Sequence, residues 1–489
     1  MTGTTLALRS SAGRWTLAAA ILGSGAVFLE STVATVALPA LAREFSLGFD
    51  GLQWVMNAYL LPLSALILLG GMLGDRYPRP RVFAIGLIGF SAACALCALA
   101  GSTAMLVAAR VAQGTFGALV VPNSLALLDE LFADADRGAA IGQWAGWSSA
   151  SSALGPLLGG WLIDAASWRW VFAGVVPFAL AAAVIALRRV PRTAARAGAR
   201  PAGPLDYPGA VLATVTLGCM TVALVTAPRT GPTAEVLGAG ALAVAAVVGF
   251  IVVERRVRDP MLPLALFASR QFSGINLVTL LVYTALGSFF FLYILMVQDV
   301  LGYGALKAGA SMLPANAVML ALSGPMGRLG TRIGARIPMT VGAAVAGAGF
   351  LLLAGIDEGA EYLTGILPGL VVFALGLATL VAPLTSAVLG AVPEGDEGVA
   401  SAVNNAAARL AGLLGTAVLP LAAGLGGLGA ATGPAFAAGY RRAMLIAAGL
   451  CLAGAVVAWL TVRRSAKVAS APHPHPSYAC ARRRVQARS

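Results

Sequence analysis

Residues 52–81 read LQWVMNAYLLPLSALILLGGMLGDRYPRPR. The first part, residues 52–73, has no charged side chain, and a helix of that length is about 33 Å long, enough to cross the roughly 30 Å hydrocarbon core of a bilayer. Charges then follow in a cluster that begins at Asp75 and ends at Arg81. A long uncharged run that ends in arginines predicts a membrane-spanning helix followed by a short cytoplasmic loop.

The same pattern recurs through the 489 residues, of which 59% are hydrophobic and only 11% are charged. A soluble chain carries about a quarter of its residues as Asp, Glu, Lys or Arg. Because backbone polar groups in lipid must be paired within the protein, the spans are helices or a closed barrel. The apolar runs are continuous and do not alternate with polar residues, which excludes a barrel. The sequence therefore predicts an all-α polytopic membrane protein.

Apolar runs between clusters of charged or turn residues give fourteen predicted spans. They cover residues 15–40, 52–73, 82–101, 104–128, 137–163, 168–188, 208–228, 235–254, 273–299, 306–328, 338–356, 363–391, 396–422 and 438–462. If both termini are cytoplasmic, 25 of the 33 Lys and Arg residues fall on the cytoplasmic side, 6 on the opposite side and two inside spans. This bias predicts a multi-pass plasma (inner) membrane protein with both termini in the cytoplasm.

An internal repeat divides the chain. Residues 71–78 (GMLGDRYP) resemble residues 327–334 (GRLGTRIG), and each copy follows the second span of a set of six. Parallel repeats of six spans are a common transporter plan, with the substrate site between the halves. The repeat predicts four parts, namely an N-terminal six-helix bundle at 15–188, a linker with two inserted transmembrane helices at 189–254, a C-terminal six-helix bundle at 255–462 and a disordered basic cytoplasmic tail at 463–489.

Among the twenty acidic residues, only Glu30 lies clearly in the middle of a predicted span. An ionised carboxylate there costs about 3 kcal/mol or more on insertion scales, so it implies a partner or a function. A low-dielectric site favours the neutral carboxyl, which suits a proton carrier. Arg110 lies at a similar depth, and Gln113 follows it on the same helical face. We interpret Glu30, Arg110 and Gln113 as a proton and substrate coupling site, with a structural tie between helices as the alternative for Arg110.

Several motifs occur in order along the chain. Residues 29–39 read LESTVATVALP, residues 71–81 read GMLGDRYPRPR, residues 106–114 read LVAARVAQG and residues 151–160 read SSALGPLLGG. Together with Asn404, Asn405 and Arg409, they resemble the motifs of the major facilitator superfamily. Within it they resemble the fourteen-span drug:proton antiporter branch, which includes multidrug and quaternary-ammonium exporters. That branch usually has an aspartate where this chain has Glu30, and Pro78 and Pro80 replace a glycine and a basic residue of the loop.

The resemblance implies a major facilitator fold of two six-helix bundles plus two inserted helices. It also implies multidrug efflux by alternating access, in which the proton gradient drives export of lipophilic small molecules such as drugs or antibiotics. It assigns a cytoplasmic gating loop to Gly71, Asp75, Arg76 and Arg79, and an antiporter motif to Gly155, Pro156, Gly159 and Gly160. An Asp–Arg pair in the loop is expected to latch two helices, although retention of the loop inside the cell explains the arginines equally well.

Polar residues in or near the spans are candidates for lining a substrate cavity. They are Asn57, Tyr59, Asn123, Asn276 and Asn404. The alternative is a hydrogen bond between neighbouring helices, which is the commoner use of such side chains in membranes.

No pattern indicates an enzyme, because no nucleophile and base stand together at one depth. Cys94 and Cys97 form a C-x-x-C without a second pair, and His473 and His475 lie in the tail, so we expect no metal and no cofactor besides the proton gradient. Membrane orientation explains the net charge of +13, and no nucleic-acid partner is expected. We expect a monomer that contacts the bilayer, protons and a lipophilic substrate.

Two alternatives to drug export stay open. Within transport, the alternative is a facilitator or importer of a small metabolite, and outside it a membrane-embedded enzyme or receptor. The single midplane acid argues against obligate dications as substrates, because two separated carboxylates would suit those better. Monocations and neutral antibiotics remain candidates.

Overall fold

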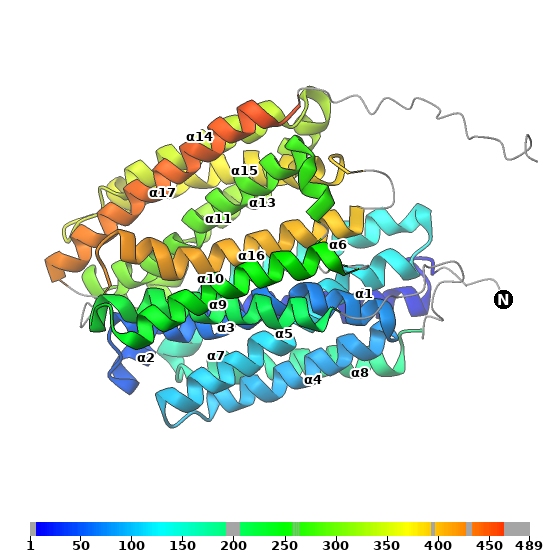
Figure 1. Cartoon of the computed structure of the whole chain (residues 1–489), viewed down its shortest axis with the longest axis horizontal. Coiled ribbons are helices and arrows are strands. Elements are labelled where there is room, and N and C mark those ends of the chain that lie inside the picture. The colour runs from blue at the N-terminus through cyan, green and yellow to red at the C-terminus, as the bar shows by residue number, and fades with distance from the viewer. Residues whose placement is uncertain are drawn as a thin grey trace, which may run out of the picture.

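The computed structural model describes residues 6–191, 206–257, 260, 262, 264–392, 397–426 and 433–463. Long helices lie side by side along one axis, with the first half of the chain in blue and cyan and the second half running from green through yellow to red (Figure 1). Most of the predicted linker, at 192–205, and the predicted tail beyond residue 463 lie outside the described residues.

Six helical passages form the first half. They are α1 (Ser11–Val36), α3 (Phe49–Arg76), α4 (Arg79–Ala98), α5 (Thr103–Leu131), α6 (Asp134–Ala165) and a passage made of α7 (Arg169–Ala173) and α8 (Val176–Arg188). The short α2 (Leu38–Phe45) follows α1 and begins with Pro39 in its first turn. Proline has no backbone N–H to continue the hydrogen bonds of α1, so the predicted span 15–40 divides into two helices.

Six further passages form the second half. They are α11 (Arg270–Leu295) with the π-helical turn η2 (Met296–Val300), α12 (Ala305–Ala310) with α13 (Leu313–Ile333), α14 (Arg336–Leu353), the π-helical turn η3 (Tyr362–Ile366) with α15 (Leu367–Leu389), α16 (Glu397–Ala422) and α17 (Gly433–Thr461). A 3-10 turn, η1 (Leu264–Ala268), precedes them. Pro314 begins α13, and the predicted span 306–328 is interrupted just before it.

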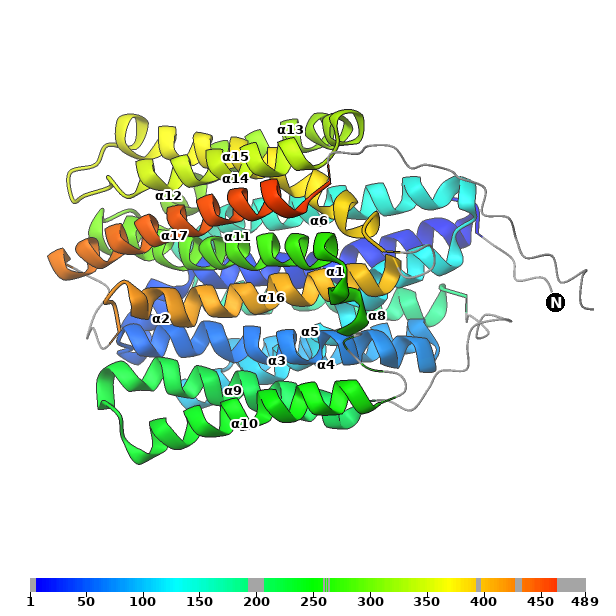
Figure 2. The same cartoon turned by 45° about the horizontal axis from the view of Figure 1, so that its top comes forward.

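Two inserted helices lie between the halves in sequence. They are α9 (Tyr207–Thr230) and α10 (Ala234–Arg256), which pack against each other as a hairpin. α9 also packs against α3 of the first half and α16 of the second (Figure 2). α10 leaves large apolar side chains exposed, including Leu237 and Val244, as a helix in contact with lipid does. The hairpin therefore covers one side of the seam between the halves.

Within the described residues, thirteen helical passages are long and apolar enough to cross a membrane. The fourteenth predicted span corresponds to α6, which has 32 residues but does not meet the apolar criterion. Its middle is polar, with serines at 148, 149, 151 and 152. Each of the fourteen predicted spans therefore coincides with a helical passage, and thirteen of these passages are apolar enough to cross a membrane.

The two ends of the helix bundle differ in charge. At one end α1 begins, α3 ends and α4 begins, with Arg76, Arg79 and Arg81 between them. We name this the arginine-rich end; it is on the right in Figure 1. α1 ends and α3 begins at the other end, which we name the arginine-poor end.

Candidate functional site

A buried ion pair lies inside the first half. The Glu30 side chain of α1 and the Arg110 side chain of α5 are both completely buried, and Arg110 Nη1 lies 2.5 Å from Glu30 Oε1. Arg110 Nε also donates a hydrogen bond to the Val55 carbonyl of α3, at 3.2 Å. Both charges therefore have a partner, as burial in a membrane requires, and the predicted proximity of Glu30 and Arg110 agrees with the structure.

Polar and aromatic groups surround this pair. Gln113 Oε1 accepts a second hydrogen bond from Arg110 Nη1, at 2.7 Å, and Gln113 Nε2 donates one to Cys94 Sγ of α4, at 3.0 Å. The Arg110 guanidinium also lies over the Tyr59 ring of α3, 4.5 Å from its centroid. The network thus joins α1, α3, α4 and α5. Sequence reasoning had placed Tyr59 only among cavity candidates and had given Cys94 no place in the site.

One oxygen of this carboxylate has no hydrogen-bond partner. Among the described residues, Glu30 Oε2 and Arg110 Nη2 are buried atoms without one. In the described part of the chain Glu30 is therefore held through Oε1, and Oε2 has the lone pairs that a proton needs. A proton bound there would neutralise the carboxylate and leave the Arg110 guanidinium without its counter-charge.

The predicted gating loop forms an ion-pair cluster at the arginine-rich end. Arg79 Nη2, at the start of α4, pairs with Asp75 Oδ1 at the end of α3, and Arg79 Nε lies 2.8 Å from Glu130 Oε2 of α5. Close by, Asn123 Nδ2 of α5 donates to the Gly70 carbonyl of α3, at 2.9 Å. Asn123, a cavity candidate by sequence, is fully buried between these helices. Three helix ends of the first half are thereby tied together.

The predicted antiporter motif brings α6 close to α1 of its own half and to α12 of the second half. A Cβ atom added to Gly155 would meet Thr32 Oγ1 of α1, and one added to Gly159 would lie 2.6 Å from Val33 Cγ1. A Cβ on Gly160 would meet the Ala305 carbonyl of α12, in the second half. The glycines therefore allow α6 to approach α1 and the backbone of α12 more closely than any other residue would.

Hydrogen bonds between the halves gather toward the arginine-poor end. Gln298 Nε2 of η2 donates to the Val36 carbonyl at 3.1 Å, and the Leu306 N–H donates to Asp164 Oδ2 at 2.9 Å. Each bond joins a residue near the end of a first-half helix to one from η2 or α12. The two halves are thus closed on each other there.

A second set of contacts joins α3 to α16. Gln53 Nε2 donates to the Thr416 carbonyl at 2.7 Å, and the Thr416 hydroxyl donates to Asn57 Oδ1. Asn57, Gln53 and Thr416 are all buried. Asn57 was a cavity candidate by sequence, and the structure places it in this contact between the halves.

Toward the arginine-rich end the same helix faces become exposed. Asn405 lies three turns before Thr416 on the same face of α16, and it is exposed whereas Thr416 is buried. On α13, Leu320 lies one turn after Asn316, which donates a hydrogen bond to the Ala153 carbonyl of α6, and Leu320 is 70% exposed. The halves therefore separate toward the arginine-rich end, and we name the space between them the vestibule.

The remaining cavity candidates bond to each other within the second half. Asn404 Nδ2 of α16 contacts Asn276 Oδ1 at 3.2 Å and Thr279 Oγ1 at 2.8 Å, both on α11. Asn276 also donates to the Phe272 carbonyl of its own helix. These side chains tie α11 to α16 on the side toward the arginine-rich end.

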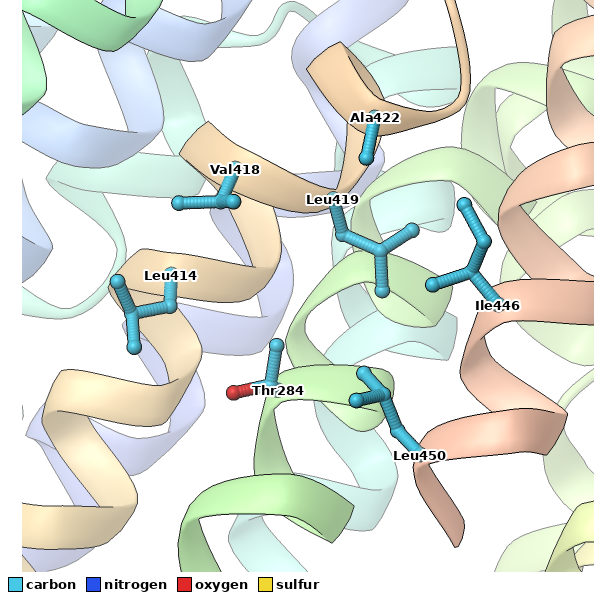
Figure 3. Close-up of a pocket in the computed structure, with 7 residues that line it drawn as sticks. All are labelled: Thr284, Leu414, Val418, Leu419, Ala422, Ile446 and Leu450. Carbon is cyan, nitrogen blue, oxygen red and sulfur yellow. The ribbon is translucent and has the colours of Figure 1, made fainter. Parts of the chain in front are cut away.

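A pocket of about 210 Å³ opens between α11, α16 and α17 (Figure 3). Its lining is apolar except for Thr284, whose hydroxyl donates to the Leu280 carbonyl of its own helix. It contains no charged side chain and none of the predicted site residues. The buried ion pair and the vestibule are therefore the candidate site.

Two six-helix bundles that meet at one end and separate at the other are the architecture of an alternating-access transporter. Residues 20–416 match the Major Facilitator Superfamily, and the chain belongs to this family. The family and the fold predicted from the motifs are thereby confirmed. The protein is thus a multi-pass membrane protein of a transporter family.

Its similarity to known proteins is extensive. The chain is 34% identical over 407 residues to the tetracenomycin C resistance and export protein of Streptomyces glaucescens, which covers 83% of this chain and 74% of that protein. It is 33% identical over 461 residues to the puromycin resistance protein pur8 of Streptomyces alboniger, covering 92% and 91%. The crystal structure of a bacterial homolog of the human lysosomal transporter Spinster, inward-facing and unoccupied, has the same fold, with a TM-score of 0.64 at 18% identity over 92% of this chain and 97% of that one.

Proposed function

We propose that this protein exports lipophilic small molecules, such as drugs or antibiotics, across the plasma membrane in exchange for protons. The observation that carries the exchange is the buried Glu30–Arg110 pair with its unbonded carboxylate oxygen. An ionisable residue inside a membrane protein is a functional candidate by default. Export is supported by relatives whose names describe antibiotic resistance and export.

The charge bias supplies the direction. Because Lys and Arg collect on the cytoplasmic side of membrane proteins, we take the arginine-rich end as cytoplasmic. The vestibule then opens toward the cytoplasm, and the contacts of Thr416 and Gly160 close the outer side. This arrangement corresponds to a state that takes up substrate from inside the cell.

The proposed cycle begins with Glu30 ionised and paired with Arg110. Substrate enters the vestibule from the cytoplasm or the inner leaflet, and the outer contacts then open while the inner ends close. A proton from outside binds Glu30 Oε2, which releases Arg110 from the ion pair and accompanies release of substrate. The protonated protein returns and loses its proton to the cytoplasm.

From the sequence, Glu30 was interpreted as part of a proton and substrate coupling site. Glu30 is completely buried, with Arg110 bonded to it and Tyr59 against the guanidinium. We therefore propose that substrate and proton exclude each other through the conformation of α1 and α5, which the ion pair holds together.

Vesicles with the cytoplasmic side outward test the proposal. We would acidify their lumen and add tetracenomycin C, the compound named in one relative, while a fluorescent pH indicator follows proton release. Substrate-dependent release should be present in the wild type and absent in Glu30→Gln. Glu44→Gln is the matched control, because Glu44 pairs with Arg169 on the surface of the same half, with both side chains about two-fifths exposed. Full proton release by Glu30→Gln would refute the assignment of the carrier, and substrate movement without protons would indicate a facilitator.

A further inference from the structure

Arg409 lies where the vestibule meets the closed contact between the halves. It is near the middle of α16, two turns before Thr416 and about one turn after Asn405, on the same helical face. Thr416 is buried against α3, Asn405 is exposed and Arg409 is intermediate. The guanidinium is therefore at the inner limit of the space that is open to the arginine-rich end.

Arg409 differs from Arg110 and Arg169 in its surroundings. Among the described residues, no carboxylate oxygen lies within 4.0 Å of the Arg409 side chain, whereas Arg110 and Arg169 each have one. It lies instead near an aromatic ring of the other half. The guanidinium carbon of Arg409 is 5.6 Å from the centroid of the Phe28 ring of α1. A charge at this depth without a counter-charge is unfavourable, so its position calls for a ligand that supplies one.

The neighbouring groups do not neutralise it. Tyr59 and Tyr283 are within electrostatic range of Arg409, but a phenol with the ordinary pKa of about 10 supplies no negative charge at neutral pH. Glu30 is the nearest acid in sequence to Phe28, but its charge is already matched by Arg110 at 2.5 Å. With that pair intact, Arg409 contributes the net positive charge of the site.

We infer that Arg409 binds the acidic group of the transported substrate, a carboxylate or an ionised phenol on an aromatic body. A guanidinium presents several N–H donors in one plane and binds such oxygens through paired charge-assisted hydrogen bonds. Phe28 would contact the apolar body from the opposite half. The inference rests on the proposed function, since it names the substrate class of the same vestibule, and it disfavours the monocations that the sequence left open.

The charge of the substrate has a consequence for the driving force. An anion that leaves the cell and a proton that enters move charge in the same electrical direction. The inside-negative membrane potential then drives both movements, in addition to the pH gradient. Exchange of a monocation for a proton would be electrically neutral and insensitive to the potential.

Two dyes on the same three-ring scaffold test the inference. Fluorescein is anionic near neutral pH and rhodamine 123 is cationic, so their binding to the purified protein in detergent can be compared by fluorescence polarisation. The wild type should bind fluorescein more tightly than rhodamine 123. Arg409→Gln should weaken fluorescein binding by about tenfold to a hundredfold, as the loss of a charge-assisted hydrogen bond predicts. Arg409→Lys should retain part of the preference, and Arg169→Gln should retain all of it.

The outcomes separate this inference from the proton mechanism. Unchanged fluorescein binding by Arg409→Gln, or a wild type that fails to bind fluorescein or prefers rhodamine 123, would overturn the role of Arg409. Proton release that still depends on Glu30 would then leave the proposed function in place. If instead Arg409→Gln loses the anion while Glu30→Gln keeps full proton release, the substrate inference stands and the carrier assignment fails. Retained selectivity in Arg409→Lys shows that the fold survives changes at this position.

Discussion

Replacement of either member of the buried ion pair should destabilise the protein strongly, and replacement of both should not. Glu30→Gln keeps the shape of the side chain but leaves the Arg110 guanidinium buried without a counter-charge. Both side chains are completely buried, so solvent does not screen the loss, and removal of one partner from such a pair costs about 3–5 kcal/mol. Arg110→Gln likewise leaves the Glu30 carboxylate buried without a counter-charge. The double variant has no buried charge here, so most of the loss should return.

Thermal unfolding in detergent can measure this cycle with a thiol-reactive fluorescent dye. Cys94, Cys97 and Cys451 are free and buried, so they react only when the helices separate. We expect a large drop in melting temperature for each single variant and a melting temperature near that of the wild type for the double variant. All three variants should lose proton-coupled transport, because each lacks the titrating pair.

The exposed pair of Glu44 and Arg169 gives the scale for comparison. Both side chains are about two-fifths exposed and 3.1 Å apart, so the loss of either should cost less than about 1 kcal/mol. If Glu30→Gln is no more harmful than Glu44→Gln, the Glu30–Arg110 pair does not carry the charges assigned to it. A double variant whose loss equals the sum of the two single losses would refute the argument from mutual neutralisation.

Three further predictions concern the contacts around the vestibule. Gly160→Ala places a Cβ against the Ala305 carbonyl and should slow transport by opening the contact of α6 with α12. Gly324→Ala, which has open space around its Cβ, should be as active as the wild type. Thr416→Val removes the hydroxyl that donates to buried Asn57, which should cost the closed arrangement about 1–3 kcal/mol. Hydrogen exchange should then be faster at the arginine-poor end of α16, and unchanged exchange would contradict a gating role. Arg79→Gln removes the ion pairs of Arg79 with Asp75 and Glu130. Arg79 and Glu130 are each less than one-fifth exposed, so the loss of stability should be about 1–3 kcal/mol. A transport loss much larger than this stability loss would identify a latch, and a proportionate loss would identify a structural tie.

Charge was the part of the site that the sequence revealed. Glu30 was recognisable because acidic residues are rare inside apolar runs, and Gln113 followed from its spacing of three residues from Arg110. The contacts of Tyr59 and Cys94 with this group were not recognisable. They depend on how α3 and α4 are rotated about their axes, and a helix that is apolar all round gives no periodic signal for that rotation.

Interhelical contacts were the part that the sequence could not assign. The glycines of residues 155–160 stood out as a motif, but nothing in the apolar pattern showed that Gly160 faces the backbone of α12. Asn57 was equally compatible with a cavity and with a hydrogen bond between helices, and its partner Thr416 is 359 residues away. The helix breaks next to Pro39 and Pro314 were missed, because counting apolar residues passes over an interruption of one or two residues.

α1 connects the proposed proton and substrate sites within a few residues. Phe28 faces Arg409 of the second half, Glu30 binds Arg110 of the first half, and the next turn of α1 packs against Gly155 of α6. A rigid helix cannot shift at one of these contacts and stay fixed at the other two. In the proposed cycle, loss of the ion pair frees α1 from α5. The position of Phe28 opposite Arg409 and the contact of α1 with α6 then change together. Coupling then needs no long chain of side chains, because one turn of one helix carries the proton site, the substrate contact and the gate.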